Sequence, residues 1–524
     1  MDIDASQYAE MSREMMVSHD YLHVYDRGTD YLDKPPMLFW LSTLSMKVFG
    51  LTNFGYKLPS VLFLFLAVYA TYRFARLLYD ESTARVAALV LMVCQGSFLM
   101  TNDVRTDTIL MGFVATALWA IKECELKRRP GFVLLGTAAL AGGLMTKGPI
   151  ALFVPLFAFG TDWLLKRKWK AIFNPWHLLD AALIAVFLIP MCIGLYQQFD
   201  LHPEKLIDGK TGTSGIKFFF WTQSFGRITG ENRWNNGADP SFLLVNMLWS
   251  FLPWIFLFLV ALFVNVRELI RQKLWLNEAQ EWVSTGGFLL TYAALGMSHY
   301  QLPHYIFVAF PLAAVVVAGL LRRFFTEGAL PKLRRGLTVT QLIVCALLMT
   351  GLALILLFTF PAGGWVWIGW AAGIVVIGIT AWQAKRGRLI WASAVTMVVL
   401  NIFLTHYFYA SLLQYQCGSQ AGQRLLREGA QPGQFIVYKN EDPLECLDFY
   451  ARGRFRRLDS SLAFNGIRYV LTQTKYLPEI SAAGRPFEVL QQGPYFKVSE
   501  LTPEFLNVRT RPAAVKQYSL IRLR

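Results

Sequence analysis

Long apolar runs constrain this chain more than any other feature of its sequence. About twelve runs are long enough, or nearly so, to cross a bilayer as helices. The chain is 55% hydrophobic and only 16% charged, whereas about a quarter of the residues of a soluble enzyme are charged. The sequence therefore predicts a polytopic α-helical membrane protein. The runs lie near residues 57–78, 84–102, 107–122, 131–147, 149–166, 177–196, 241–265, 284–298, 303–321, 338–360, 364–384 and 389–412.

Basic residues orient the predicted bundle. They cluster in every second connection between the runs, as at residues 127–129, 166–170 and 385–388, and such clusters mark cytoplasmic loops. The net charge of +15 is therefore explained by membrane orientation and does not indicate a nucleic-acid partner. The segments expected on the opposite side are residues 1–56, 102–107, 147–149, 197–240 and everything after residue 412.

These patterns divide the chain into three predicted parts. Residues 1–56 form a first outer loop with an interfacial helix, residues 57–412 the transmembrane bundle, and residues 413–524 a small soluble α/β domain. In that domain "QFIVYKN", "IRYVLTQT", "FEVLQQ" and "YFKVS" are typical of strands, and "GSQAGQRLLREGAQPG" is typical of a helix that ends at glycine. Cys417 and Cys446 would be able to form a disulfide there if the domain lies outside the cell.

The parity of the spans raises a question about the first outer loop. Twelve spans place both ends of the chain on the outer side, yet no signal peptide and no apolar run precedes Met37. Residues 1–56 therefore contain nothing that would carry them across the membrane. We expect a further helix ahead of them, which gives about thirteen transmembrane helices in the full-length protein.

Charged side chains gather at the outer boundary of the predicted bundle. They lie in "MDIDASQYAEMSREMM", "TDYLDKPPMLFW", "TNDVRTDTILMGF" and "LMTKGPIALF". Each has a local explanation, because Asp4 and Asp107 are able to cap helices, and Lys34 and Lys147 are able to reach the interface. Together, two carboxylates and two lysines at one depth favour a cavity. Lysines would hold an anionic phosphate there, and a carboxylate would take a proton from a hydroxyl.

These segments resemble the polytopic C-type (GT-C) glycosyltransferases, above all the bacterial protein O-mannosyltransferase family and the aminoarabinose–lipid A transferases. "DASQYAEMSREM" is similar to the family's D-E-A-x-Y-A followed by R-E-M, with Ala5 in place of the second acidic residue. D-K-P-P is intact at residues 33–36, R-x-D-x-x-L at 105–110 and T-K-G-P at 146–149. "SHYQLPHYIFVAFPLA" resembles S-K-x-x-x-Y-x-x-x-x-P, with His299 where lysine is usual.

The resemblance implies a GT-C fold and the inverting transfer of a sugar from a polyprenyl-phosphate donor. Asp4 would be the catalytic carboxylate that takes the proton of the acceptor hydroxyl, and Asp107 would be a second catalytic carboxylate. Lys34 would neutralise the leaving phosphate, assisted by Arg227 or Arg233, in an electrostatically stabilised transition state. Support of the substrate site is expected from Tyr8, Asp33, Asp103, Arg105, Lys147, His299 and Tyr305.

The same resemblance implies a multi-pass protein of the bacterial inner membrane, with its active site and C-terminal domain on the periplasmic side. The expected partners are the lipid-linked sugar donor, a lipid or protein acceptor, and membrane lipid. Aminoarabinose for lipid A, mannose for protein hydroxyls, and transfer to another envelope glycan all stay open. No cofactor is required, and a divalent metal stays open without support from any metal-ligand spacing. No G-x-G-x-x-G fingerprint of a nucleotide-binding fold is present.

Two other functions stay open at this point. A lipid or solute transporter or flippase would also be polytopic, although its charges would lie at mid-membrane in paired halves. A non-catalytic scaffold with a decayed site is the other alternative. The loop of residues 197–240 is either a connector or a functional lid, since it is far longer than about 15 residues. Its Trp221, Phe225 and Trp234, like Tyr305, would stack on substrate or anchor the chain at the interface.

Overall fold

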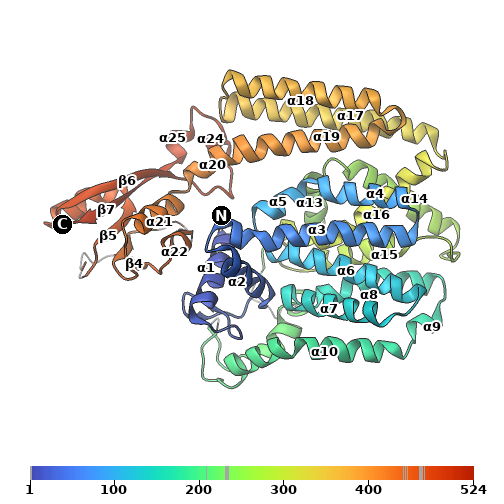
Figure 1. Cartoon of the computed structure of the whole chain (residues 1–524), viewed down its shortest axis with the longest axis horizontal. Coiled ribbons are helices and arrows are strands. Elements are labelled where there is room, and N and C mark those ends of the chain that lie inside the picture. The colour runs from blue at the N-terminus through green and yellow to red at the C-terminus, as the bar shows by residue number, and fades with distance from the viewer. Residues whose placement is uncertain are drawn as a thin grey trace. The chain divides into compact units, whose positions relative to one another are not determined.

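The computed structural model describes residues 3–207, 209–229, 235–440, 442, 444, 446–459, 464 and 466–524. Within it the chain forms two compact units, whose elements are labelled in Figure 1. The larger unit comprises residues 18–345 and 378–397, and the smaller one comprises residues 1–17, 346–377 and 398–524.

The larger unit is a bundle of helices in which neighbours along the chain pack against each other. Figure 1 shows α3, α6, α7, α8 and α10 side by side, and α8 also packs against α15. Each predicted apolar run coincides with one of its helices, with a broken helix, or with a helix shared between the units. The elements are α2 (Met37–Phe49), α3 (Asn53–Leu78), α4 (Glu81–Val93), α5 (Gln95–Asn102), α6 (Thr106–Leu126), α7 (Pro130–Lys147), α8 (Ile150–Leu165), α9 (Trp169–Ile172), α10 (Trp176–Leu195), η1 (Tyr196–Asp200), α11 (Gly215–Lys217), η2 (Phe218–Thr222), α12 (Gly226–Thr229), α13 (Phe242–Ser250), α14 (Ile255–Arg271), α15 (Val283–Gly296), η3 (Pro303–Ala309), α16 (Phe310–Phe325) and α17 (Pro331–Leu354).

Length and hydropathy make this a multi-pass membrane protein. In the described part of the chain, six helical segments are long and apolar enough to cross a bilayer. A seventh results if α4 and α5, which meet at a bend of 50°, count as one span. The remaining helices of the bundle are shorter or carry more charge. The six segments are Asn53–Leu78, Trp169–Asp200, Pro303–Phe325, Pro331–Thr359, Gly364–Gln383 and Arg388–Tyr415.

Turn residues fix where these helices begin and end. The side chain of Thr52 accepts a hydrogen bond from the backbone N–H of Gly55 and so caps α3, and Asp80 caps α4 by accepting from Thr83. Between α7 and α8, Gly148 adopts a φ of +86°, a conformation that glycine reaches without steric cost. Pro149 follows and cannot continue the preceding helix. Lys147 is therefore held as the last residue of α7.

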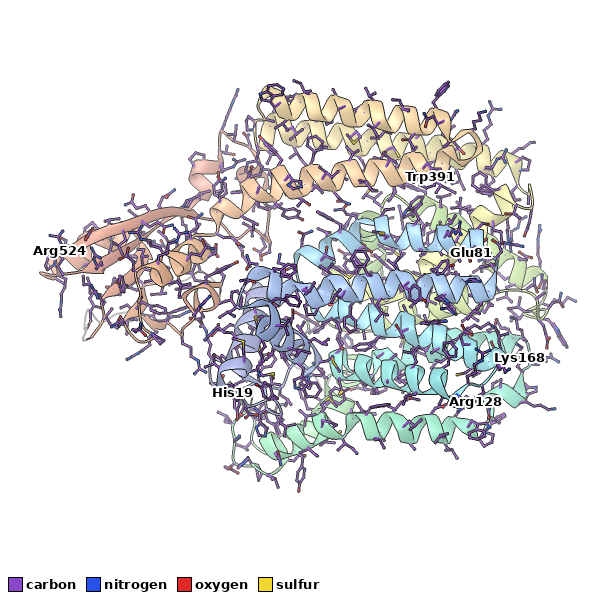
Figure 2. The ribbon with its side chains drawn as sticks, in the orientation of Figure 1. His19, Glu81, Arg128, Lys168, Trp391 and Arg524 are labelled. Atoms are coloured by element: carbon purple, nitrogen blue, oxygen red, sulfur yellow. The ribbon has the colours of Figure 1, made fainter. Side chains whose placement is uncertain are left out.

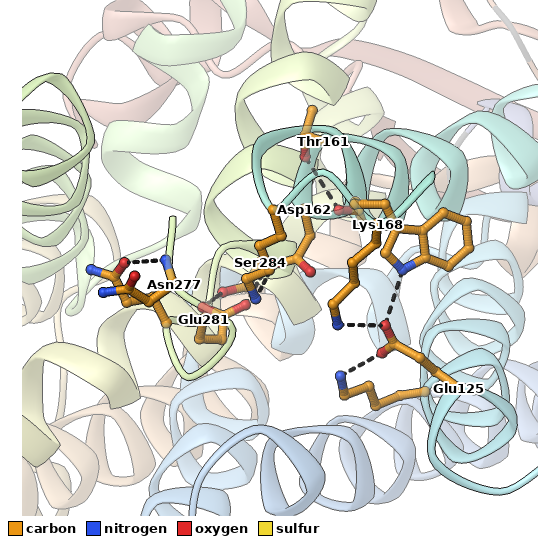
Figure 3. Close-up of polar contacts among 12 residues, drawn as sticks. Glu125, Thr161, Asp162, Lys168, Asn277, Glu281 and Ser284 are labelled. Carbon is orange, nitrogen blue, oxygen red and sulfur yellow. Dashed lines mark hydrogen bonds and ion pairs between the residues drawn. The ribbon is translucent and has the colours of Figure 1, made fainter. Parts of the chain in front are cut away.

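A polar network joins the helices at one end of the bundle. Figure 2 shows Glu81, Arg128 and Lys168 at this end, and His19 at the opposite end. At the C-terminal end of α6, Glu125 accepts hydrogen bonds from Lys122 Nζ (2.5 Å), Trp163 Nε1 (3.0 Å) and Lys168 Nζ (3.3 Å). Figure 3 shows this carboxylate between side chains from different helices. The contacts tie α6 to the C-terminal end of α8.

A second carboxylate, Glu281, forms polar contacts at the start of α15 (Figure 3). Its carboxylate accepts from the backbone N–H of Ser284 (2.7 Å), the hydroxyl of Ser284 (2.6 Å) and the hydroxyl of Tyr79 (3.3 Å). The first two bonds satisfy donors that a helix N-terminus leaves open. Burial raises the pKa of the Glu281 carboxyl.

We predict that Glu281→Ala lowers the stability of the protein. It leaves the Ser284 donors and the buried Tyr79 hydroxyl without their acceptor, which costs about 1–3 kcal/mol. Thermal unfolding of the purified protein in detergent would show a lower melting temperature. Glu278→Ala is the matched control, because Glu278 is exposed in the same loop. Equal melting temperatures for the two variants would contradict this account of the network.

The smaller unit contains a five-stranded mixed sheet in the order β4-β3-β5-β7-β6. β3 (Phe435–Tyr438) pairs in parallel with β4 (Arg456–Leu458) and β5 (Tyr469–Gln473). β7 (Lys516–Leu523) pairs antiparallel with β5 and β6 (Phe487–Tyr495). Its helical elements are α18 (Gly364–Gln383) and α19 (Arg388–Phe403), each in part, η4 (Ile355–Thr359), η6 (Leu404–Tyr409), α20 (Ala410–Leu412), η7 (Leu413–Tyr415), α21 (Cys417–Arg427), α22 (Cys446–Ala451), η8 (Thr474–Tyr476), α23 (Leu477–Ala482), α24 (Pro503–Leu506) and α25 (Arg511–Ala514).

Most of the predicted local structure of this domain is confirmed. The strands at "FIVY", "YVLTQ" and "FEVLQQ" and the helix before Gly429 are present. The predicted strand "YFKVS" is wrong, because β6 ends at Tyr495. Phe496 instead stacks on Phe505 with ring centroids 3.8 Å apart. Its side chain therefore packs between loop and helix and does not belong to a strand. The sequence reasoning also missed β7, whose Tyr518 and Leu520 are buried in the domain core.

A buried polar cluster lies inside this domain. The hydroxyl of Tyr518 donates toward Asp442 Oδ2 (2.6 Å) and Asn440 Oδ1 (2.7 Å), and Lys516 Nζ binds Asp442 Oδ1 (2.7 Å). Burial and Asp442 raise the pKa of Tyr518, so it stays a neutral donor. Cys417 and Cys446 are buried and are not joined by a disulfide.

The N-terminal helix α1 (Ile3–Ser18) is bound to the C-terminal domain. Arg454 Nε donates to Glu14 Oε1 at 2.7 Å. Arg13 forms two bonds to Glu10 (2.5 and 2.7 Å) and one to the carbonyl of Arg452 (3.4 Å). Because such charge-assisted bonds are directional, the C-terminal domain fixes the rotation of α1 about its own axis.

We predict that reversing one charge loosens α1 and that reversing both restores it. Arg454→Glu puts two carboxylates together and removes a pair that contributes about 1 kcal/mol. Hydrogen exchange measured by mass spectrometry would be faster in residues 3–18 of that variant and would return to normal in Glu14→Arg/Arg454→Glu. The control is Arg456→Glu, because Arg456 is exposed on β4. Unchanged exchange in Arg454→Glu would rule out this role of the ion pair.

Candidate functional site

A buried ion pair forms the centre of the candidate site. Asp107 lies in the first turn of α6, and Lys147 is the last residue of α7. Lys147 Nζ lies 2.6 Å from Asp107 Oδ1, and the aspartate side chain is only 2% exposed. A charge so deeply buried requires a partner, because desolvation of a lone ion costs far more than folding supplies. Two residues that are forty positions apart in the sequence are thereby brought into contact.

Two residues of η3 stand beside this pair. His304 Nε2 lies 3.6 Å from Asp107 Oδ2. The ring of Tyr305 lies under the lysine, with Nζ of Lys147 4.1 Å from the ring centroid, a distance at which a cation and an aromatic face attract each other. The rings of His304 and Tyr305 meet edge to face, 5.3 Å apart. Lys147 therefore contacts a carboxylate and an aromatic face.

A cavity of about 240 Å³ opens next to Lys147. Among the residues that the structure describes, the charged side chains that line it are those of two lysines, and most of its wall is aliphatic or aromatic. Phe225, from the long loop, meets Phe153 of α8 edge to face with centroids 5.6 Å apart. The lining residues are Lys34, Leu110, Lys147, Pro149, Ile150, Phe153, Phe157, Gln223, Ser224, Phe225, Ala294, Leu295, Ser298, Tyr305 and Val308.

The segment before α2 brings the second lysine to this cavity. Lys34 Nζ lies 2.6 Å from Asp33 Oδ2. Gln223 donates to the backbone carbonyl of Asp33, and so joins the long loop to this corner. Pro35 and Pro36 restrict the backbone before α2 begins at Met37. The rigid corner thus positions a cation at the cavity wall.

The remaining predicted site residues are placed as follows. Arg105 Nε binds Asp103 Oδ2 at 2.8 Å in the turn before α6. His299 is exposed. Asp4 and Tyr8 lie on α1, in the smaller unit, whereas the cavity lies entirely in the larger one. The side chain of Arg227, on α12, and the whole of Arg233 and Trp234 lie outside the described residues.

Sequence reasoning missed His304 and Gln223 as site residues. His304 follows Pro303 in "LPHYIF", and only the position of its neighbour Tyr305 in a motif pointed to this segment. Gln223 carries no charge and lies in a loop without periodicity. Among the residues that the structure describes, no group of three or more His, Cys, Asp or Glu side chains forms a metal site. The cavity is suited to an amphiphile with an anionic head and an apolar tail.

Comparison with known proteins identifies the fold. The family described as dolichyl-phosphate-mannose-protein mannosyltransferase matches residues 33–193. ArnT from Cupriavidus metallidurans, solved in the apo state and bound to undecaprenyl phosphate, superimposes with a TM-score of 0.71 in both states. It is 17% identical in sequence, and the match covers 99% of this chain and 93% of the apo ArnT chain. This chain has the GT-C fold. The expectation of a polytopic GT-C protein with a small C-terminal α/β domain is therefore confirmed.

Two curated relatives of this chain carry the same name. An undecaprenyl phosphate-α-4-amino-4-deoxy-L-arabinose arabinosyl transferase of Edwardsiella ictaluri is 26% identical over 370 residues, 69% of this chain. The match spans 61% of the length of that relative. A transferase of the same name from an Enterobacter species is 24% identical, over 83% of this chain and 73% of its own length. The predicted resemblance to aminoarabinose transferases is confirmed.

We predict that removing either member of the Asp107–Lys147 pair harms stability more than removing both charges. Lys147→Met leaves a buried carboxylate without its cation, which costs about 3–5 kcal/mol. Asp107→Asn/Lys147→Met contains no buried charge at this point, and its melting temperature would recover part of the loss. Thermal unfolding of the single and double variants measures the coupling. Additive losses would mean that the two side chains do not stabilise each other.

Proposed function

We propose that this protein transfers a sugar from a polyprenyl phosphate to an acceptor in the cell envelope. The observation that carries the proposal is the cavity, in which two lysines accompany apolar and aromatic walls. A polyprenyl phosphate has the matching chemistry, since an anionic head adjoins a long apolar chain. Relatives are named as undecaprenyl phosphate-aminoarabinose transferases, and ArnT has been solved with undecaprenyl phosphate bound.

In the proposed reaction, an acceptor oxygen attacks the anomeric carbon of the lipid-linked sugar. The bond between that carbon and the phosphate oxygen breaks, and the configuration inverts. Asp4 takes the proton of the acceptor hydroxyl, and Lys34 balances the charge of the leaving phosphate. Asp107 keeps Lys147 at the cavity, and Arg227 or Arg233 assists at the phosphate. No cofactor or metal takes part.

The proposal includes the sugar, the acceptor and the location. The name shared by the relatives favours aminoarabinose over mannose, with lipid A as the acceptor and a protein hydroxyl as the alternative. The site and the C-terminal domain would lie on the periplasmic side of a bacterial inner membrane. The positive-inside distribution of basic residues supports this orientation. Labels at the two termini of the full-length protein, assigned to one or the other side of the membrane, provide an independent check of this orientation.

A transporter or flippase is not favoured. The charged pairs described above lie at the ends of helices, and the named relatives are transferases. Counterflow of labelled lipid-linked sugar in proteoliposomes, without any glycosylated product, would reverse this preference.

We predict that the purified protein makes a glycosylated product and that Lys34→Ala loses about two orders of magnitude in turnover. Mass spectrometry of lipid A and envelope glycoproteins, with and without the gene, identifies the product. Transfer from undecaprenyl phosphate-aminoarabinose in detergent gives the rate. Asp4→Asn is expected to abolish transfer in a folded protein, whereas Lys332→Ala, at an exposed lysine of α17, is the control. Near-normal turnover in Lys34→Ala or Asp4→Asn would remove that residue from its proposed role.

A further inference from the structure

The two oxygens of the Asp107 carboxylate have unequal surroundings. Oδ1 lies 2.6 Å from Lys147 Nζ. Oδ2 is buried and accepts no hydrogen bond from any residue that the structure describes. His304 Nε2 faces Oδ2 at 3.6 Å, which is too long for a hydrogen bond. Oδ1 is therefore already bound, whereas Oδ2 has a potential donor nearby that does not reach it.

Lys147 also has two sides. Its ammonium group contacts Asp107, lies over the face of Tyr305, and belongs to the wall of the cavity. An ammonium is a compact charge on a flexible stem, so that it can change partners without moving its backbone. A phosphate in the cavity would compete with Asp107 for this cation. Lys34, whose own partner Asp33 is more exposed, would face no comparable cost.

A simple loss of Lys147 would be costly for Asp107. The carboxylate is nearly fully buried, and a buried charge that loses its partner is strongly destabilised. The phosphate would then bind weakly, because part of its binding free energy would offset the destabilisation of the unpaired Asp107 carboxylate. A second hydrogen-bond donor near Oδ2 lowers this cost. His304 is such a donor, and a small rotation of its ring would close the gap to hydrogen-bond length.

We propose that His304 is a positioning residue that takes over the Asp107 carboxylate when Lys147 turns to an anionic phosphate in the cavity. The exchange leaves each ionised group with a hydrogen-bond or ion-pair partner in both states. It rests on the proposed function for the identity of the natural ligand. His304 does not line the described cavity wall, so it acts through Asp107 and has no contact with the ligand in this role.

Binding of undecaprenyl phosphate to the purified full chain tests the exchange. His304→Leu is expected to bind about tenfold more weakly, because freeing Lys147 then strands Asp107. His304→Gln keeps a neutral donor and is expected to stay within about threefold of the wild type. Asp107→Asn/His304→Leu is expected to recover the lost affinity, since an amide needs no cation. His406→Leu is the control, at an exposed histidine of η6.

Wild-type affinity in His304→Leu would overturn the exchange, as would a double variant as weak as His304→Leu alone. A purely structural histidine would predict the latter result, because a second substitution would not repair packing.

Dodecyl phosphate, which has a phosphate head and no polyprenyl chain, separates this inference from the proposed function. If the variants follow the expected order with it while the wild type transfers no sugar, the exchange stands and the proposed function falls. If sugar transfer occurs but the order is absent with both phosphates, the exchange falls alone. A wild type that binds neither phosphate overturns both.

Discussion

The ion pair between Asp107 and Lys147 is the constraint on which the candidate site depends. It can form only where the start of α6 meets the end of α7, and where Gly148 and Pro149 stop α7 at the lysine. The pair leaves one flank of the lysine toward a cavity with apolar walls. A low-dielectric setting strengthens this interaction and makes any unpaired state expensive. The site is therefore organised before any ligand arrives.

The two ends of the helical bundle have different roles. At the start of α6 and the end of α7, Asp107 and Lys147 form an ion pair, and Lys147 adjoins a cavity and an aromatic face. At the opposite end of the bundle, Glu125 and Glu281 each accept several hydrogen bonds, which join α6 to the end of α8 and the start of α15 to Tyr79 (Figure 3). Saturated hydrogen bonding rigidifies that end, so that the helix ends at the cavity keep their spacing. The fold thus separates the contacts that hold the helices together from the contacts available to a ligand.

The sequence was informative where chemistry is local and weaker where it depends on three-dimensional approach. Apolar runs located the helices because burial in lipid demands about twenty apolar residues. The motifs around Lys34 and Lys147 pointed to one boundary, and both side chains line one cavity. His304 was overlooked, since only the turn of η3 brings it to Asp107, and the motif drew attention to the exposed His299 instead. The "YFKVS" strand failed because Phe496 packs on Phe505, a contact that no periodicity encodes.

The bond between α1 and the C-terminal domain has a consequence for biogenesis. Glu14 is synthesised 440 residues before its partner Arg454. The helix that carries Asp4 therefore gains this contact only after the C-terminal domain has been synthesised. A nascent or truncated chain without Arg454 lacks this ion pair. The acidic motif of α1 is therefore held in place only after translation has passed the helical bundle and reached the C-terminal domain.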